Sequence, residues 1–375
     1  MVWRLVSRMV PYLNETFVAI RQKFRNITYS TPTIPRWKTC VDTMNYKYQF
    51  ITGRMYVDDH FPEDDKQKVL DMVWNVQRAF KSMLINNDWL QEEDKAVVAE
   101  KVDAMELAVG YPEWIKNNAK LDEEYSRLAS QADDEYFHNN LRYLRWRTQS
   151  YLALLRKPVE RSLWIFGPTV VNAFYFRKNG ILLPAGIFQP PVFHSDLPWY
   201  SNYGAIGFVM GHEITHGFDN NGREYDKDGN RRTWWSQQSI DSFEDRIQCI
   251  IDQYSSFVMP ENNRSLNGEQ TQGENIADNG GLRESYKAYM DYIPKQPRLP
   301  GIYFTEEQMF FLSYSQVWCS AFEPEGADMF IDYAVHSPGR YRVIGPLQNN
   351  EAFSAAFNCP AGSYMNPEKK CKVWY

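Results

Sequence analysis

The sequence predicts an α+β protein that is mostly α-helical and divided into two domains. Helical hydrophobic periodicity fills about the first 155 residues, a short stretch rich in β-branched and aromatic residues follows near residue 160, and helical patterns then return. A chain of 375 residues also exceeds the size at which single hydrophobic cores usually stop growing. We therefore predict an all-helical domain over residues 1–158 and a second domain over residues 159–375.

Three helices are predicted in the first domain. Residues 62–87 carry apolar side chains at i, i+3 and i+4 spacing and begin with the acidic run "PEDD", which suits the positive end of a helix dipole. The same pattern recurs over residues 92–109, just before Gly110, and over residues 133–156. These spans account for most of the N-terminal region.

The second domain is predicted to begin with short strands and to continue with helices. The stretches "WIFGPTVVNAFYF" and "NGILLPAGIFQPPVF" combine β-branched and aromatic residues with Gly and Pro, as expected of short strands joined by turns. Helices are predicted over residues 203–217, 236–255, 269–291 and 305–320. A small β element followed by helices is the layout of an α+β fold.

Composition narrows the classes of function. The chain has 43% hydrophobic and 23% charged residues, which is ordinary for a globular protein. Its net charge of −6 and its lack of a basic run argue against nucleic-acid binding. The first residues, "MVWRLVSRMVPYL", are too short and too charged for a membrane span or a signal peptide. We therefore expect a soluble chain without a targeting segment.

Two features nevertheless suggest an extracellular protein. N-glycosylation sequons begin at Asn14, Asn26 and Asn263. The cysteines show no Cys-x-x-Cys spacing, which disfavours a cysteine zinc site, and their odd number suggests that part of the protein is missing. They are Cys40, Cys249, Cys319, Cys359 and Cys371.

The clearest chemical signal is the sequence "HEITH" within the predicted helix 203–217. His212 and His216 are four residues apart and share one helix face, so both imidazoles can bind one ion. Glu213 lies about a hundred degrees round the helix, where it can reach a metal-bound water and act as general base. From this motif alone, a polar helix facing solvent is the alternative interpretation.

The predicted helix 269–291 supplies a third ligand. Glu274 and Asp278 share one face of it. Glu274 would complete a His2Glu zinc site with an open fourth position, and Asp278 would accept a hydrogen bond from a ligand histidine. Without a cation the two carboxylates would repel each other, which disfavours an ordinary acidic face. Gly280 and Gly281 suit close packing against a second helix.

These motifs resemble the neprilysin family of zinc metalloendopeptidases, which includes endothelin-converting-enzyme-like proteins. The resemblance rests on "VMGHEITHGFDNNGREYDKDG", "GENIADNGGL", "VNAFYF" with "LPAGIFQPP", and the ending "SYMNPEKKCKVW", and it extends along the whole chain. It implies a thermolysin-like zinc peptidase domain over residues 159–375 and part of a helical cap domain over residues 1–158. It also implies one Zn2+ per chain.

The resemblance also implies a role for each residue of the site. It assigns the zinc ligands to His212, His216 and Glu274. It makes Glu213 the catalytic base and Asp278 the carboxylate that orients a ligand histidine.

Four further roles come from the resemblance and not from spacing. Asn172 and Ala173 match residues that hydrogen-bond the backbone of an extended peptide substrate. His336 matches the histidine that stabilises the oxyanion, and Arg342 matches the arginine that binds a substrate carbonyl. Without the resemblance, "VNAFY" would be interpreted as core strand, His336 as a loop histidine and Arg342 as a surface charge.

The resemblance implies an apolar pocket for the substrate residue after the scissile bond. Val192 stands where a larger aromatic is usual, and Phe208 where a smaller residue is usual, so the pocket departs from the family pattern at both positions. The predicted lining is Ile187, Val192, Phe208, Val209, Val317 and Trp318.

Members of this family are membrane-anchored proteins with a large extracellular domain. The resemblance covers only the C-terminal half of that domain. We therefore expect an extracellular or cell-surface protein that contacts the membrane only through an anchor absent from this chain. By position, the resemblance pairs Cys249 with Cys371, whereas Cys40, Cys319 and Cys359 match cysteines with upstream partners. Unpaired thiols and an uncovered helical face predict a less stable, aggregation-prone product.

The sequence thus predicts a zinc-dependent endopeptidase that hydrolyses short peptides on the amino side of hydrophobic residues, with a zinc-activated water and Glu213 as general base. The alternative is a truncated, catalytically inactive fragment that binds zinc or peptides without turnover. A structural zinc domain is disfavoured because three ligands leave an open coordination position, whereas structural sites are closed.

Overall fold

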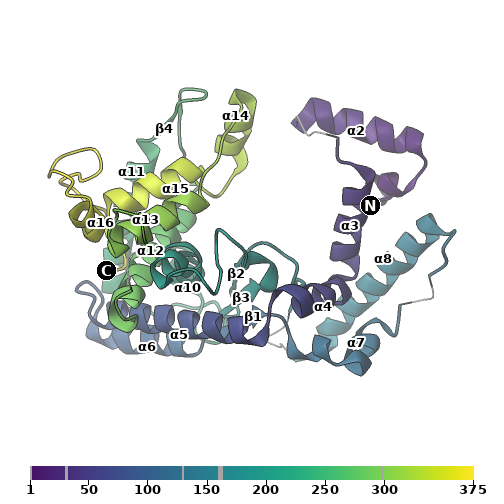
Figure 1. Cartoon of the computed structure of the whole chain (residues 1–375), viewed down its shortest axis with the longest axis horizontal. Coiled ribbons are helices and arrows are strands. Elements are labelled where there is room, and N and C mark those ends of the chain that lie inside the picture. The colour runs from purple at the N-terminus through teal and green to yellow at the C-terminus, as the bar shows by residue number, and fades with distance from the viewer. Residues whose placement is uncertain (1, 30–32, 129–130, 159–163, 297–298) are drawn as a thin grey trace. The chain divides into compact units, whose positions relative to one another are not determined.

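The computed structural model describes most of the chain (Figure 1). Residues outside the description are 1, 30–32, 129–130, 159–163 and 297–298. The chain forms two compact units, each built from two segments. Unit 1 comprises Met1–His60 and Tyr111–Thr169, and unit 2 comprises Phe61–Gly110 and Val170–Tyr375.

The compact units differ from the predicted domains in two respects. The sequence assigns residues 61–110 to the first domain, whereas they fold with unit 2. It assigns residues 164–169 to the second domain, whereas they belong to unit 1. The predicted boundary between residues 158 and 159 falls on residues outside the description, so that boundary itself stays a prediction.

The described part of unit 1 is helical. Its elements are α1 (Val2–Met9), the 3-10 turn η1 (Val10–Tyr12), α2 (Glu15–Tyr29), α3 (Arg36–Lys47), α4 (Gln49–His60), the 3-10 turn η2 (Glu113–Lys116), α7 (Asn118–Tyr125), α8 (Tyr136–Ala153) and the 3-10 turn η3 (Leu154–Arg156). The predicted helix 133–156 is therefore confirmed as α8 followed by η3. Aromatic contacts join its segments: the Phe50 ring lies 4.8 Å from that of Trp114, and the Tyr125 ring lies 5.5 Å from that of Trp146.

Unit 2 combines helices with a small sheet (Figure 1). Its first segment contains α5 (Glu63–Ile85), α6 (Glu92–Asp103) and β1 (Glu106–Gly110). The second segment contains β2 (Phe174–Phe176), β3 (Gly180–Pro184), η4 (Ala185–Ile187), α9 (Trp199–Asn202), the π-helical turn η5 (Tyr203–Gly207), α10 (Phe208–Thr215), η6 (His216–Phe218), η7 (Gly222–Glu224), α11 (Gln237–Ser255), β4 (Val258–Met259), β5 (Arg264–Ser265), α12 (Gln272–Tyr292), α13 (Glu306–Val317), α14 (Pro324–Tyr333), α15 (Gly339–Gln348) and α16 (Glu351–Ala356).

The prediction of one helix over residues 92–109 is wrong at its C-terminal end. Helix α6 stops at Asp103, and residues 106–110 form strand β1 instead. Met105, Leu107 and Val109 alternate along the chain, and Met105 and Val109 are buried. This period of two suits a strand, and pairing with β3 overrides the helical pattern that precedes it.

The sheet has the strand order β1-β3-β2. Strand β3 is central and fully buried; it pairs in parallel with β1 and antiparallel with β2. The registers place Leu107 opposite Ile181 and Tyr175 opposite Ile181 on the other side. Strand β2 therefore stands at an edge of this sheet, and the chain enters it directly from residues 172–173.

Helices α10 and α12 cross in close contact, and glycines permit the approach. A Cβ atom at Gly281 would lie 2.4 Å from the backbone nitrogen of His212, and one at Gly211 would lie 2.8 Å from the Cα of Gly281. A larger residue at either position would force the two helices apart. The glycines predicted to favour close helix packing therefore bring the two motif-bearing helices together.

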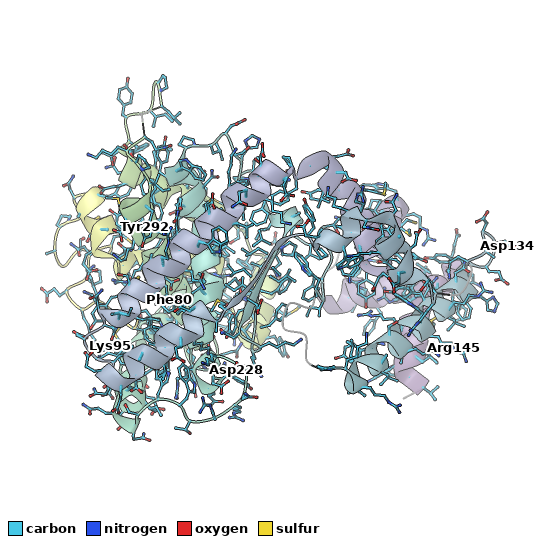
Figure 2. The ribbon with its side chains drawn as sticks, turned by 90° about the horizontal axis from the view of Figure 1, so that it is seen from below. Phe80, Lys95, Asp134, Arg145, Asp228 and Tyr292 are labelled. Atoms are coloured by element: carbon cyan, nitrogen blue, oxygen red, sulfur yellow. A yellow bond between two sulfur atoms is a disulfide. The ribbon has the colours of Figure 1, made fainter. Side chains whose placement is uncertain are left out.

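Aromatic side chains from distant segments pack beneath these helices. Phe80 on α5, labelled in Figure 2, is fully buried. Its ring centroid lies 5.2 Å from that of Phe218, which follows the histidine motif, and 6.1 Å from that of Trp374 near the C-terminus. Packing of this kind stabilises helices that would be marginal in isolation.

The disulfide between Cys249 and Cys371 is present, which confirms the predicted pair. It ties α11 to the C-terminal segment across a sequence separation of 122 residues. The other cysteines, Cys40, Cys319 and Cys359, are free, and the first two are exposed. No helix within the described residues has the length and apolar character needed to cross a membrane.

Candidate metal centre

His212, His216 and Glu274 converge in unit 2. His212 lies on α10, His216 begins the 3-10 turn that continues it, and Glu274 lies in the first turn of α12. The Nε2 atoms of the two histidines are 3.0 Å apart. The Oε2 atom of Glu274 lies 3.2 Å from Nε2 of His212 and 3.4 Å from Nε2 of His216. The predicted third ligand is therefore beside the histidine pair.

These three atoms fit a zinc ion. Ligands about 2.0–2.1 Å from zinc in a tetrahedral arrangement lie about 3.3 Å from one another. The observed separations of 3.0–3.4 Å match that value. Glu274 Oε2 is also buried without a well-formed hydrogen bond, as expected of an oxygen that binds a cation. The donor set His2Glu is one that catalytic zinc sites use.

Each histidine is oriented by a buried aspartate through its other ring nitrogen. Nδ1 of His212 lies 2.9 Å from Oδ1 of Asp278, as predicted. Nδ1 of His216 lies 2.7 Å from Oδ2 of Asp219, a partner that sequence reasoning missed. Both contacts turn Nε2 toward Glu274. Such carboxylate–histidine pairs fix the ring orientation and raise the basicity of a ligand.

Arg342 lies behind the orienting carboxylate of Asp278. Its Nε and Nη2 atoms donate to the two oxygens of Asp278 at 2.8 and 2.7 Å. The guanidinium carbon also lies 3.8 Å from the centroid of the Trp318 ring. Burial acts to raise the pKa of Asp278, but the charge of Arg342 and the hydrogen bonds to this carboxylate outweigh burial and hold the pKa below its usual range. Asp278 is therefore held as an anion against His212.

Electrostatics make the cluster a site for positive charge. Burial disfavours the ionised form of Glu274, but its close contacts with His212, His216 and His336 outweigh burial and hold its pKa far below the usual range. Burial likewise acts to lower the pKa of His212 and His216, yet their carboxylate partners raise both. A divalent cation would satisfy the same atoms.

Glu213 is buried beside the cluster and is not one of its three converging residues. Burial raises the pKa of its carboxyl, and the charge of Glu274 acts in the same direction, while His212 and His216 oppose the rise. A carboxyl with a raised pKa can both accept and return a proton.

His336 reaches the cluster from the loop before α15. Its Nε2 atom lies 3.1 Å from Oε2 of Glu274, and the side chain is about half exposed. The following residue, Ser337, donates a hydrogen bond of 2.7 Å to Asn275 on α12, and both side chains are buried. The Ser337–Asn275 bond therefore fixes the loop that carries His336, another contact that sequence reasoning missed.

Comparison with known proteins identifies the family. The sequence model described as peptidase family M13 matches residues 172–373, and a second model of the same family matches residues 1–112. The chain belongs to peptidase family M13.

Named relatives agree with this assignment. The M13 chain is 44% identical to mouse membrane metallo-endopeptidase-like 1 and 43% identical to human neprilysin, in each case over 100% of its own length. It covers 50% and 51% of these two proteins, so it spans about half the length of the curated relatives it matches.

Solved structures confirm the predicted fold class. A crystal structure of a zinc metalloprotease from Mycobacterium tuberculosis in complex with an inhibitor matches the M13 chain with a TM-score of 0.88 and 31% identity. The match covers 100% of this chain and 57% of that one. The mostly helical α+β fold is therefore that of M13 peptidases.

The remaining predicted residues of the M13 site are placed as follows. The buried Phe208 ring lies 5.8 Å from that of Trp318 and 6.0 Å from that of His212, so these two pocket residues are beside the metal cluster. Asn172 is exposed and Ala173 is buried, immediately before edge strand β2. Ile187 is buried, whereas Val192, Val209 and Val317 are half-buried. The substrate-binding roles of all these residues stay predictions.

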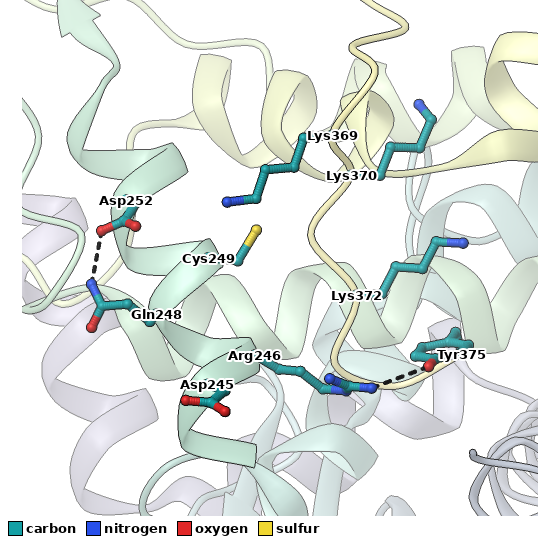
Figure 3. A pocket seen from close by; sticks show the side chains of 9 residues that line it. All are labelled: Asp245, Arg246, Gln248, Cys249, Asp252, Lys369, Lys370, Lys372 and Tyr375. Carbon is teal, nitrogen blue, oxygen red and sulfur yellow. Dashed lines mark hydrogen bonds between the residues drawn. The ribbon is translucent and has the colours of Figure 1, made fainter. Parts of the chain in front are cut away.

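A pocket of about 360 Å³ lies at the disulfide of the M13 chain, on α11 and the C-terminal segment (Figure 3). Protein oxygens engage three of its four cations: Lys370 Nζ donates to the carbonyl of Gln348 at 2.6 Å, Lys372 pairs with Glu351, and Arg246 donates to the Tyr375 hydroxyl at 3.5 Å. We assign no ligand to this pocket.

Proposed function

We propose that this chain is a zinc-dependent endopeptidase that hydrolyses short peptides on the amino side of hydrophobic residues. One observation carries the proposal: His212, His216 and Glu274 converge within 3.4 Å while the carboxyl of Glu213 is buried beside them on the same helix as His212. Membership of peptidase family M13 supports it.

One Zn2+ per chain would be held by His212, His216 and Glu274. When bound, zinc acts as a Lewis acid that lowers the pKa of a coordinated water to about 7. Asp278 and Asp219 would keep the two imidazoles in the tautomer whose Nε2 lone pair is free for the metal.

Glu213 is the proposed general base. Its carboxylate would accept a proton from the attacking water and donate that proton to the leaving amine. Its raised pKa suits both steps, because the protonated form must survive long enough to act as an acid. Its neighbour on the same helix, His212, would remain a ligand throughout.

His336 and Arg342 would complete the polar side of the site. His336 is close enough to Glu274 to reach an oxyanion formed beside the cluster, and its partial exposure leaves it accessible to substrate. We propose that Arg342 binds a substrate carbonyl in addition to holding Asp278. The proposed catalytic residues are thus Glu213 and His336, with Asp278 orienting a ligand.

The substrate would bind as an extended strand. Asn172 and Ala173 precede the edge strand β2, whose outer side can accept a peptide by strand addition. The substrate side chain after the scissile bond would enter the proposed apolar pocket beside the metal cluster. Its lining is Ile187, Val192, Phe208, Val209, Val317 and Trp318.

We propose an extracellular or cell-surface location. The sequon residues Asn14, Asn26 and Asn263 are all exposed, so the structure leaves them accessible to glycosylation. Digestion with an N-glycosidase after secretion from cultured cells would lower the apparent mass if any sequon is used. Secreted protein with an unchanged mass would argue against glycosylation.

Cleavage of a quenched fluorescent peptide with Phe or Leu after the scissile bond tests the function. We expect turnover with zinc, none with a chelator, and none in Glu213→Gln. The matched control is Glu325→Gln at an exposed position of α14, which should keep wild-type turnover.

The same experiment distinguishes the alternative. If one zinc binds per chain but no peptide in a diverse library is cleaved, the chain is an inactive zinc- or peptide-binding fragment. Turnover that survives both the chelator and Glu213→Gln would contradict the proposed mechanism.

A further inference from the structure

A lysine on α6 is buried beneath the loop that follows the metal-binding helix. Lys101 has no exposed surface. Its Nζ atom donates three hydrogen bonds to backbone carbonyls: to Gly217 at 2.5 Å, to Gly222 at 2.8 Å and to Tyr225 at 2.6 Å. An ammonium group has three N–H donors, so each finds an acceptor in this one loop.

The same loop presents Asp219 to the metal ligand His216. Oδ2 of Asp219 lies 2.7 Å from Nδ1 of His216, and its Oδ1 accepts hydrogen bonds from the backbone N–H groups of Asn221 and Gly222 at 2.8 and 2.6 Å. A Cβ atom at Gly222 would lie 1.8 Å from the carbonyl oxygen of His216, so the loop folds back tightly onto the ligand.

The peptide units around Gly222 connect the lysine to the aspartate. The N–H of Gly222 binds Asp219, while its carbonyl binds Lys101. The other two carbonyls, of Gly217 and Tyr225, flank Asp219 in sequence. The lysine therefore fixes the loop on both sides of the carboxylate that orients His216.

Ordinary core packing does not account for this lysine. Burying an ammonium is costly unless it is fully hydrogen-bonded, and an apolar residue would fill the same space without that cost. The rings of Phe218 and Trp234 lie 5.0 and 5.2 Å from Nζ, which adds attraction but no specificity for the loop. What only a lysine supplies here is three donors directed at three carbonyls.

We propose that Lys101 is a positioning residue of the metal centre: it fixes the loop so that Asp219 holds His216 in its ligating orientation. The proposal rests on the proposed zinc site. It also assigns a site function to the segment matched by the second M13 model, residues 1–112, whereas the three ligands lie in residues 172–373. Removing this segment would leave the ligand His216 without its support.

Lys101→Met tests the proposal, because it keeps the length of the side chain and removes its donors. The matched control is Lys95→Met, six residues earlier on α6 (Figure 2), where the ammonium pairs with exposed Glu92. Two quantities are measured: the dissociation constant of zinc by competition with a chromogenic chelator, and the visible spectrum of the Co2+-substituted protein, which reports ligand geometry. Far-UV circular dichroism of the metal-free proteins checks folding.

We expect Lys101→Met to weaken zinc binding by about 10–100-fold, the range for partners of metal ligands, and to alter the cobalt bands. Lys95→Met should do neither. Asp219→Asn should cause a similar loss, and the double variant Lys101→Met/Asp219→Asn should lose little more than Asp219→Asn alone, because both act through one path.

Three outcomes would overturn the proposal. An unchanged zinc affinity and cobalt spectrum with a lowered Tm would make Lys101 a fold residue only. Full additivity in the double variant would exclude action through Asp219. If neither Lys101→Met nor Lys101→Gln folds, the lysine serves the fold and not the site. A wild-type chain that binds no zinc would instead refute the proposed function.

Discussion

Unit 1 and unit 2 bury their apolar side chains to different extents. In unit 2, Phe80 lies in the first segment and Trp374 lies near the end of the second segment. Nevertheless, at most 2% of either residue is exposed. In unit 1, Trp3, Phe24 and Trp37 remain 76%, 60% and 68% exposed. Unit 2 is held together by contacts between distant segments, whereas the first helices of unit 1 leave large apolar side chains uncovered.

This difference indicates where function resides and where the chain is vulnerable. The candidate metal cluster draws its proposed ligands, its orienting carboxylates and its buried lysine from α6, α10, η6, the loop after η6 and α12, all within unit 2. Exposed apolar groups of the kind found on α1–α3 mark interaction surfaces or aggregation-prone regions. Changes in unit 2 should therefore affect stability and chemistry, and changes in unit 1 should affect chiefly self-association.

The largest effect is expected at the metal cluster itself. Glu274→Gln keeps the side-chain size but removes the ionised ligand. Loss of a residue that merely hydrogen-bonds a ligand typically weakens metal binding by about 10–100-fold, so zinc affinity should fall by more than this. Peptide cleavage should be lost. Zinc content after dialysis and peptide turnover measure both effects. The control, Glu269→Gln at a nearby exposed position, should change neither. Retained zinc in Glu274→Gln would contradict the assignment of this ligand.

The next largest effect should come from the disulfide. Replacing Cys249 and Cys371 by serine removes a cross-link between residues that are 122 positions apart. The loss should lower the free energy of unfolding of unit 2 by about 4–5 kcal/mol. Guanidinium unfolding followed by tryptophan fluorescence measures the loss. Cys40→Ser in unit 1, where the thiol is free and exposed, should change stability by at most about 0.5 kcal/mol. Equal losses in both variants would remove the contrast between the units.

A smaller effect should depend on pH. Glu284 on α12 is fully buried beneath α10, where its Oε1 accepts a hydrogen bond of 2.5 Å from Thr215. Burial raises its pKa well above the usual range. The folded protein therefore binds this proton more tightly than the unfolded chain, so stability falls as pH rises from the unfolded pKa of about 4.3 toward the folded pKa.

Glu284→Gln should remove that dependence, because the amide oxygen can still accept from Thr215 and carries no charge. The variant should exceed the wild type in Tm at pH 8, and the difference should shrink toward pH 5. Each pKa unit between the folded and unfolded states corresponds to about 1.4 kcal/mol. Parallel pH profiles for the two proteins would show that Glu284 does not ionise with a raised pKa.

The smallest effect on stability is expected on the exposed face of unit 1. Trp37→Ser should change the free energy of unfolding by at most about 0.5 kcal/mol and reduce self-association in analytical ultracentrifugation. Phe80→Ala, the comparison in unit 2, should cost about 3–5 kcal/mol. If Trp37→Ser destabilised the chain as much as Phe80→Ala, the face that carries Trp37 would have to be buried in solution.

The sequence predicted the parts of the fold that local pattern determines. Helix α5 follows its apolar periodicity, and the spacing of His212 and His216 placed them on one helix face as observed. The prediction of a helix failed at residues 106–110, where β1 forms because the buried strand β3 offers a parallel partner. A period of two in Met105, Leu107 and Val109 was the available signal.

The residues of the candidate site likewise include some that local spacing predicts and others that it does not. The convergence of His212, His216 and Glu274, with Asp278 beside His212, was predictable because residues four apart on a helix share a face. Asp219 could have been found from its position three residues after His216, but the choice of its partner depends on how the loop folds back at Gly222. Lys101 gave no signal, since a lysine within an amphipathic helix is normally a solvated charge.

Residue types and short-range spacing were therefore enough to predict the fold class, the family and the residues of the candidate metal cluster. The folded chain was needed to show which distant groups support these residues: Asp219 and Lys101 behind His216, and Arg342 behind Asp278. It also showed how the chain divides into units. Such pairings depend on where glycines allow segments to approach and where buried polar atoms find partners. Spacing along the chain does not encode these distances.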